Sequence, residues 1–203
     1  MKKFPAIATV EFKEIPVGIL ATDAMLKKAP LSLFKSGTIS HGRYLTLIGG
    51  STASVEESYK EGLECGQESV LDHIFLPDIH PGIYDAIITE KRVALTGDAM
   101  AILETRTVSS NIFATEIALK GTLVDLVELR LADSLLDGKA LSILHGPLHD
   151  IEASIDLAVH ALTEKNREVS CRVITSPEES LTRGISASTH FLSKELSILD
   201  GEI

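Results

Sequence analysis

The chain has 203 residues, 44% of them hydrophobic and only 4% aromatic, and a formal net charge of −10. An acidic chain without a basic cluster lacks the attraction for phosphate on which nucleic-acid binding depends, so we expect no nucleic-acid partner. No apolar run is long enough to cross a membrane and the amino terminus lacks the apolar stretch of a signal peptide, which predicts a cytoplasmic protein without membrane contact.

The first predicted elements are a strand and a helix. Residues 6–12 mix β-branched and apolar residues with single polar ones, which is the pattern of a half-buried strand. Pro16 then stands where a first helical turn tolerates proline, and apolar residues follow at spacings of three and four. We therefore expect an amphipathic helix, which Pro30 ends.

Two more strands are predicted next. Residues 31–34 and 44–48 have the composition of strands, joined by a loop over 35–43, and the glycine pair at 49–50 breaks the second strand. This pair precedes a helix and could cradle a phosphate, but it lacks the spacing of the known phosphate-binding loops. We therefore favour an ordinary strand-to-helix turn.

A second helix is predicted from about residue 55 to 66. Ser54 and Glu57 have the spacing of a capping box, which places the start of this helix at Ser54. A further strand is predicted at 70–76, so the unit consists of strand, helix, strand, strand, helix and strand. This order predicts an α+β fold, a split βαβ unit of the ferredoxin-like kind with both helices on one face of an antiparallel sheet.

The second half of the chain repeats this unit. Asp150 is the counterpart of Ser54 and predicts a helix over about 151–165, before a strand at 171–175. A turn-rich bridge at 77–82 and a short apolar piece at 84–88 connect the copies. Repeats of this size identify a tandem duplication. The returning segments, the first two offset by 93 residues and the third by 96, are 6–13 at 99–106, 21–27 at 114–120, and 42–50 at 138–146.

These repeats divide the chain into two domains and a tail. We place the first domain at residues 4–92, the second at 93–180, and a C-terminal tail at 181–203. Within the tail, three leucines have the spacing of a short amphipathic helix, although such tails more often lack fixed structure. These leucines are Leu192, Leu196 and Leu199.

The reactive residue types form no recognisable active site. His145 and His149 are four residues apart, but Gly-Pro at 146–147 separates them, so they do not share a helical face as a metal-binding pair would. No serine lies in a nucleophile elbow, and the carboxylates fall on the predicted solvent-facing sides of helices. Cys65 and Cys171 stand at non-equivalent places, which predicts reduced, buried thiols and no thiolate metal site.

The duplicated motifs resemble the bacterial microcompartment shell proteins, in their tandem-domain class and most of all in the propanediol-utilisation type. The residues that carry the resemblance are the opening strand with Glu11, the helix end at 23–27, the loop at 39–42 and the strand at 45–50, within about residues 6–176. The resemblance implies a structural protein and not an enzyme. It implies a homotrimeric pseudohexamer that tiles with hexameric and other shell proteins around encapsulated enzymes in the cytoplasm.

The resemblance also assigns roles to particular residues. It implies that small polar metabolites cross a central pore, and that Lys27 and Lys120 contact the neighbouring tile at its edge, although either would be unremarkable as a plain surface lysine. The residues that match the pore loops are Ile39, Ser40, His41, Gly42, Leu135, Leu136, Asp137 and Gly138. In three copies, their hydroxyl, imidazole and carboxylate groups would face the metabolites, and the imidazole can change charge near neutral pH.

One residue departs from the propanediol-utilisation pattern. Ser40 stands where those relatives have the cysteine whose three copies hold an iron–sulfur cluster, and serine is a poor ligand for such a cluster. We therefore expect no cofactor. Two alternatives stay open: a tandem sensor that binds a nucleotide or small anion in a loop cleft, and a shell pore that conducts electrons through an iron–sulfur cluster. The acidic composition weakens the first alternative, and Ser40 weakens the second.

Overall fold

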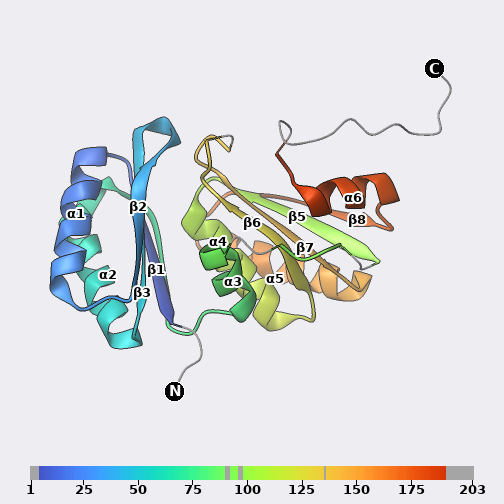
Figure 1. Ribbon diagram of the computed structural model, residues 1–203, viewed down its shortest axis with the longest axis horizontal. Helices are drawn as coiled ribbons and strands as arrows, with labels where there is room; N and C mark the ends of the chain where they lie inside the picture. Colours follow the sequence, from blue (N-terminus) through green and yellow to red (C-terminus); the bar gives the residue numbers. More distant parts are fainter. Residues whose placement is uncertain (1–4, 90–91, 96–97, 135, 191–203) are drawn as a thin grey trace.

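The computed structural model describes residues 5–89, 92–95, 98–134 and 136–190. Two domains of the same topology lie side by side, the first at the left and the second at the right of Figure 1. Each contains an antiparallel four-stranded sheet, in the order β2-β3-β1-β4 in the first domain and β6-β7-β5-β8 in the second. The predicted α+β fold with two split βαβ units is confirmed.

The two domains have matching elements in matching order. The first contains β1 (Ala6–Phe12), α1 (Ile15–Lys28), β2 (Leu33–Ile39), β3 (Arg43–Gly50), α2 (Thr52–Gly66) and β4 (Val70–Leu76), and α3 (Pro81–Thr89) follows it. The second contains β5 (Ala99–Thr105), α4 (Val108–Gly121), β6 (Asp125–Leu131), β7 (Ala140–Gly146), α5 (Leu148–Glu164) and β8 (Val169–Thr175), and α6 (Glu179–Ala187) follows it. The helices α3 and α6 are therefore counterparts that extend the repeat beyond its last strand.

Two predictions about the first sheet were wrong. The segment 35–43 is not a loop throughout, because β2 continues to Ile39 and pairs with β3 along its whole length. Because β2 is the edge strand and much of its surface is solvated, it lacks the apolar pattern by which a buried strand is recognised in a sequence. Gly49 and Gly50 do not break β3 either, because they pair with Ile7 and Ala6 of β1.

The helix starts also differ from the predicted ones. Ser51, not Ser54, is the N-cap of α2, and its side chain accepts a hydrogen bond from the Ser54 N–H. The helix α5 begins directly after Pro147, so Asp150 lies within its first turn. In each case the chain turns into the helix directly after its glycine-ended strand, several residues before the polar residue that resembled a cap.

Other segments are more ordered, or less buried, than we predicted. The apolar piece at 84–88 belongs to α3, and part of the predicted tail forms α6. Both cysteines are unpaired, but they are half-buried and not buried. The three tail leucines lie outside the described residues. Among the helices that the structure describes, none has the length and hydropathy to span a lipid bilayer.

Both faces of the first sheet are covered. The helices α1 and α2 pack on one face, over a core that includes Phe12, Met25 and Ile48. On the other face, α4 of the second domain packs against β1 and β4. All seven residues of β1 are therefore buried.

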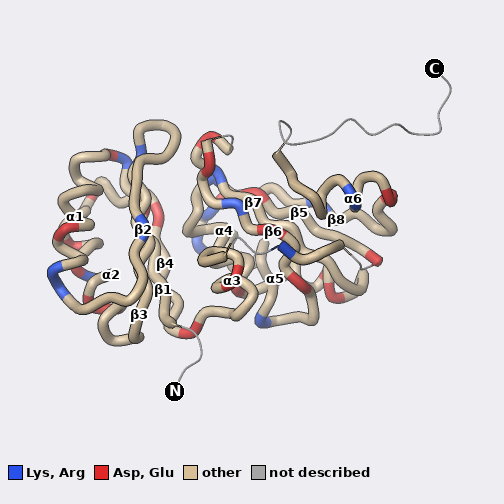
Figure 2. Tube along the Cα trace, in the orientation of Figure 1, with Lys and Arg blue, Asp and Glu red and all other residues tan. Residues whose placement is uncertain are grey.

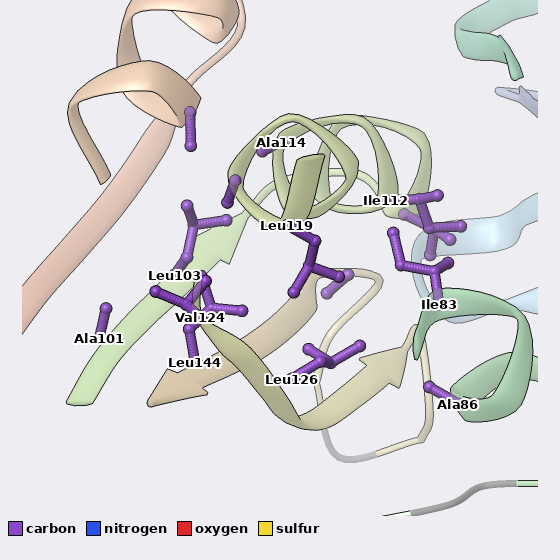
Figure 3. Packing of buried hydrophobic residues seen from close by; sticks show 14 of the residues in the cluster. Ile83, Ala86, Ala101, Leu103, Ile112, Ala114, Leu119, Val124, Leu126 and Leu144 are labelled. Carbon is purple, nitrogen blue, oxygen red and sulfur yellow. The ribbon is translucent and has the colours of Figure 1, made fainter. Parts of the chain in front are cut away.

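A single apolar cluster joins the two domains. It contains Ile7 and Leu47 from the first sheet together with residues of α3, α4 and the second sheet. Figure 3 shows Ile83 of α3 next to Ile112 of α4 at the side of this cluster, both without exposed surface. Burying such aliphatic side chains is the main favourable term in packing, so the two domains form one folded unit.

Candidate functional site

The two loops matched by the sequence meet at one end of the join between the domains. Ser40–Gly42 form a single 3-10 turn between β2 and β3, and residues 132–139 connect β6 to β7. Nε2 of His41 lies 2.8 Å from Oδ1 of Asp137, and both side chains are exposed. A Cβ atom placed on Gly138 would lie 3.5 Å from the Ser40 carbonyl oxygen, so the two backbones also approach closely.

Both loops make the same tight turn. The φ angle is +65° at His41 and +67° at Gly42, and +52° and +74° at their counterparts Asp137 and Gly138. Left-handed backbone costs a residue with a Cβ atom about 1–2 kcal/mol, whereas glycine adopts it freely and aspartate and asparagine visit it more often than most. The duplication has therefore kept a strained turn at the same place in both copies.

The other predicted pore residues have different surroundings. Ile39 ends β2 and packs against the apolar cluster that joins the domains, so it is partly withdrawn from solvent. Gly42 is exposed, and Ser40 is half-buried. Leu136 is half-buried within a local turn, where its N–H donates to the Asp133 carbonyl at 3.0 Å. The prediction for Leu135 falls outside the described residues.

A charged cleft of about 420 Å³ opens beside these loops. Within it, Nζ of Lys139 lies 2.9 Å from Oε1 of Glu104, and Nε of Arg106 lies 2.6 Å from Oε2 of Glu168. The residues that line it are His41, Arg43, Glu104, Thr105, Arg106, Asp137, Lys139, Glu168, Val169 and Ser170. Acidic and basic residues are mixed there, and Figure 2 shows residues of both charges dispersed along the chain in both domains.

The two predicted edge lysines are not in equivalent environments. Nζ of Lys27 lies 2.5 Å from Oδ2 of Asp23, and the side chain is 74% exposed. Nζ of Lys120 lies 2.5 Å from Oε1 of the buried Glu116, and it also donates to the carbonyl of Asp78 in the bridge between the domains. One lysine is therefore held in the join of the two domains, while its counterpart remains exposed.

Sequence reasoning missed a buried polar network where α4 meets the first sheet. Asp72 of β4 accepts hydrogen bonds from the hydroxyls of Thr107 and Ser110, the second at 2.6 Å. Its other carboxylate oxygen lies 2.6 Å from a guanidinium nitrogen of Arg167. Buried carboxylates need such partners, so Asp72 fixes the amino-terminal end of α4 on the sheet.

Glu11 belongs to the same network. Its Oε1 accepts the backbone N–H of Ser109 at 2.7 Å, and the Ser109 hydroxyl lies 2.7 Å from that of Thr9. Burial raises the pKa of Glu11 from its ordinary value of 4.5 to about 7, while the Ser109 N–H opposes the rise and the nearby Asp72 adds to it. A strand glutamate that recurs in both copies was the only sequence signal of this site.

The described residues do not fit a metal cofactor. Among them, no three His, Cys, Asp or Glu side chains are grouped so that they could hold a metal ion. Cys65 lies on α2 and Cys171 on β8, and Ser40 occupies the loop, so no thiolate faces the position where the loops meet. Serine is a poor ligand for an iron–sulfur cluster, and neither loop contains a cysteine.

Comparison with known proteins gives consistent results. A family model described as the BMC domain matches residues 6–79 and again 99–177. The chain is 32% identical over 178 residues to the bacterial microcompartment shell protein PduT from Citrobacter freundii, an alignment that covers 88% of this chain and 96% of that protein.

Solved structures share the fold. A microcompartment protein from Desulfitobacterium hafniense is 35% identical, with a TM-score of 0.75, over 89% of this chain and 99% of its own. A fused permuted hexameric shell protein from the RMM microcompartment is 21% identical, with a TM-score of 0.55, over 79% of this chain and 82% of its own. The second likeness concerns the fold alone.

Proposed function

Because this chain belongs to the bacterial microcompartment shell proteins and carries two copies of their domain, we propose that three chains close into a ring of six domains with a pore at its centre. The chain is a structural component of a shell that surrounds a compartment in the bacterial cytoplasm. The ring is a tile of that shell, and it has no catalytic role.

The observation that carries this proposal is a set of apolar side chains that are buried or half-buried in one copy and exposed in the other. Ile112 has no exposed surface, whereas its counterpart Ile19 is 52% exposed. The same contrast recurs for several other large residues at this join. The counterparts are Phe113 and Leu20, Leu119 and Leu26, Leu126 and Phe34, and Ile83 and Leu181, of which the first of each pair is buried or half-buried and the second is exposed.

This contrast indicates that the exposed apolar residues of the first domain and of α6 belong to an interface with another chain. In Figure 3, Ile83 of α3 covers the side of the second domain where Ile112 and Leu126 lie. In the first domain the equivalent side is exposed among the described residues, and Leu181 of α6, the counterpart of Ile83, is exposed as well. A contact that joins one face to a different face repeats head to tail, and it closes into a ring when the rotation between units divides a full turn.

The pore is supported by the pair His41 and Asp137. These residues are counterparts, and a rotation moves a point in proportion to its distance from the axis, so counterparts can touch only close to that axis. Their 2.8 Å contact therefore favours an axis beside these loops. In a ring of three chains, imidazole and carboxylate groups would alternate around the opening, which suits the passage of small polar metabolites.

The remaining assignments follow from this arrangement. We propose that the loops around Ser40 carry no iron–sulfur cluster, so that anaerobically purified protein is colourless and free of iron. Lys27 and Lys120 remain our proposed contacts with neighbouring tiles, which include hexameric shell proteins. Mixing the protein with a hexameric shell protein should give sheets or tubes in electron micrographs.

Sedimentation equilibrium tests the ring directly. At micromolar concentration we expect three times the chain mass of 21.9 kDa. Leu20→Asp should shift the protein toward monomer, because it places a charge in the contact between chains. Leu123→Asp is the matched control, since Leu123 is 85% exposed and does not belong to the apolar cluster that joins the domains. A wild-type monomer, or an equal effect of the two variants, would contradict the proposal.

A further inference from the structure

The join within the chain and the proposed join between chains are counterparts, but their polar residues differ. Within the chain, Asp72 of β4 accepts a hydrogen bond from the hydroxyl of Thr107, the N-cap of α4. The counterpart of Asp72 is Ser170, because these residues pair with the equivalent Glu11 and Glu104. The counterpart of Thr107 is Glu14, the N-cap of α1, whose side chain makes no capping hydrogen bond. Within the chain the sheet carries the carboxylate and the helix N-cap carries the hydroxyl, whereas at the counterpart positions the sheet carries the hydroxyl and the N-cap carries the carboxylate.

A second pair of positions changes in the same concerted way. Within the chain, the hydroxyls of Thr9 and Ser109 lie 2.7 Å apart in a buried contact. Their counterparts are Ile102 and Pro16, so a polar pair has been replaced by an apolar pair. Both partners changed together in each case, which keeps each pairing complementary.

The carboxylate of Glu104 also has a different partner from that of Glu11. Glu11 receives the N–H of Ser109, but the counterpart Pro16 has no N–H to offer Glu104. Glu104 is instead held by Nζ of Lys139 at 2.9 Å. It is only half-buried, unlike Glu11, and so does not depend on a backbone donor.

Glu104 and Ser170 both line the charged cleft. This cleft therefore occupies the place in the second domain that the amino-terminal end of α4 fills in the first. We propose that the amino-terminal end of α1 from a neighbouring chain inserts into the charged cleft. This inference rests on the ring proposed above. In the cleft, Ser170 donates its hydroxyl hydrogen to the Glu14 carboxylate of the neighbour, and Pro16 of the neighbour packs on Ile102.

This exchange also determines which domains can adjoin. If α1 docked on the first sheet of another chain, Glu14 would face the like-charged Asp72, and Pro16 would leave Glu11 without its N–H donor. Like charges and unpaired buried carboxylates oppose such a contact strongly. First and second domains must therefore alternate around the ring.

A charge-exchange cycle tests this contact in the full chain. Ser170→Asp should raise the dissociation constant of the trimer by about tenfold or more, because two carboxylates would then meet. The double variant S170D/E14T recreates the acid–hydroxyl pair found within the chain, and it should restore the constant to within about threefold of wild type. Sedimentation velocity over a dilution series measures both.

Ala53→Asp is the matched control, because it adds one carboxylate to the exposed face of α2, far from the join. Circular dichroism establishes that each variant is folded. A trimer that tolerates S170D, or a double variant that stays dissociated while E14T alone assembles, would overturn the contact between Ser170 and Glu14. Those outcomes leave the ring intact, whereas a monomeric wild type would remove the ring itself.

Discussion

The backbone N–H of Ser109, in the first turn of α4, donates a 2.7 Å hydrogen bond to the carboxylate of Glu11 on a strand of the other domain. The other oxygen of that carboxylate is buried and has no hydrogen-bond partner within the described residues. Glu11 therefore ties the two domains together through one bond while its charge remains poorly solvated. Burial and the nearby Asp72 raise its pKa from 4.5 to about 7, against the effects of Ser109 and Arg43.

This raised pKa predicts that acid strengthens the fold. The unfolded chain releases the Glu11 proton near pH 4.5, but the folded chain retains it until about pH 7. Ionised Glu11 thus destabilises the folded state increasingly between pH 4.5 and 7, by on the order of 3 kcal/mol at higher pH. Glu11→Gln should raise the melting temperature at pH 8 and leave it nearly unchanged at pH 5. Equal shifts at both pH values would show that the carboxylate is not responsible, and Glu104→Gln at the equivalent, half-buried position is the control.

Truncation of equivalent isoleucines should separate folding from assembly. Ile112→Ala removes a side chain without exposed surface and should lower the free energy of unfolding by about 2–5 kcal/mol. Ile19→Ala should change the unfolding of the dissociated chain by less than about 1 kcal/mol, yet weaken the trimer. Urea denaturation at low protein concentration measures the first effect, and sedimentation the second. Similar losses of folding stability in both variants would refute the assignment of Ile19 to an intermolecular contact.

The tight turn at Gly138 should resist a side chain. With φ at +74°, Gly138→Ala should cost about 1–2 kcal/mol of folding stability, because an L-residue is strained in left-handed backbone. Gly37 on β2 has open space around it and no left-handed backbone, so Gly37→Ala should stay within about 0.5 kcal/mol of wild type. Thermal unfolding of the two variants compares them directly, and equal stabilities would contradict the predicted strain.

The packing of α1 against α2 should show compensation between two positions. A Cβ atom on Gly62 would lie 2.5 Å from Sδ of Met25, so Gly62→Ala should cost about 1–3 kcal/mol despite the better helix propensity of alanine. The second copy places Ala158 and Ala118 at these two positions, and both are fully buried. Adding Met25→Ala should therefore recover part of the loss, as a double-mutant cycle in urea would measure. Strictly additive losses would count against direct contact.

The sequence was informative where local patterns decide the structure. The strands at 6–12 and 70–76 were predicted with their observed bounds, because their patterns of apolar and β-branched residues match the structure. The duplication then supplied the topology of the second domain from that of the first. The extent of the polar edge strand β2 was not predicted, since its pairing with β3 depends on backbone hydrogen bonds and not on apolar side chains.

The site was only partly accessible to sequence reasoning. The alignment of the two copies matched the loops of His41 and Asp137, but it could not show that they touch, because that contact depends on how the domains are rotated. The network of Glu11 and Ser109 joins residues 98 positions apart and leaves no local pattern. The sequence does contain one signal, a difference between the two copies. Pro16 stands at the position equivalent to Ser109, and proline has no N–H to donate, so the contact within the chain and the proposed contact between chains must differ in their hydrogen bonds.

The bridge that leads from β4 through α3 into the second domain affects how the proposed ring assembles. It makes every other join of the proposed ring intramolecular, so the effective concentration of those partners is set by a short tether and does not fall on dilution. Only two encounters between separate molecules are then needed to assemble the ring, where six independent domains would require five. The tether also lowers the symmetry of the opening from sixfold to threefold, which frees alternate positions such as those of His41 and Asp137 to evolve different chemistry.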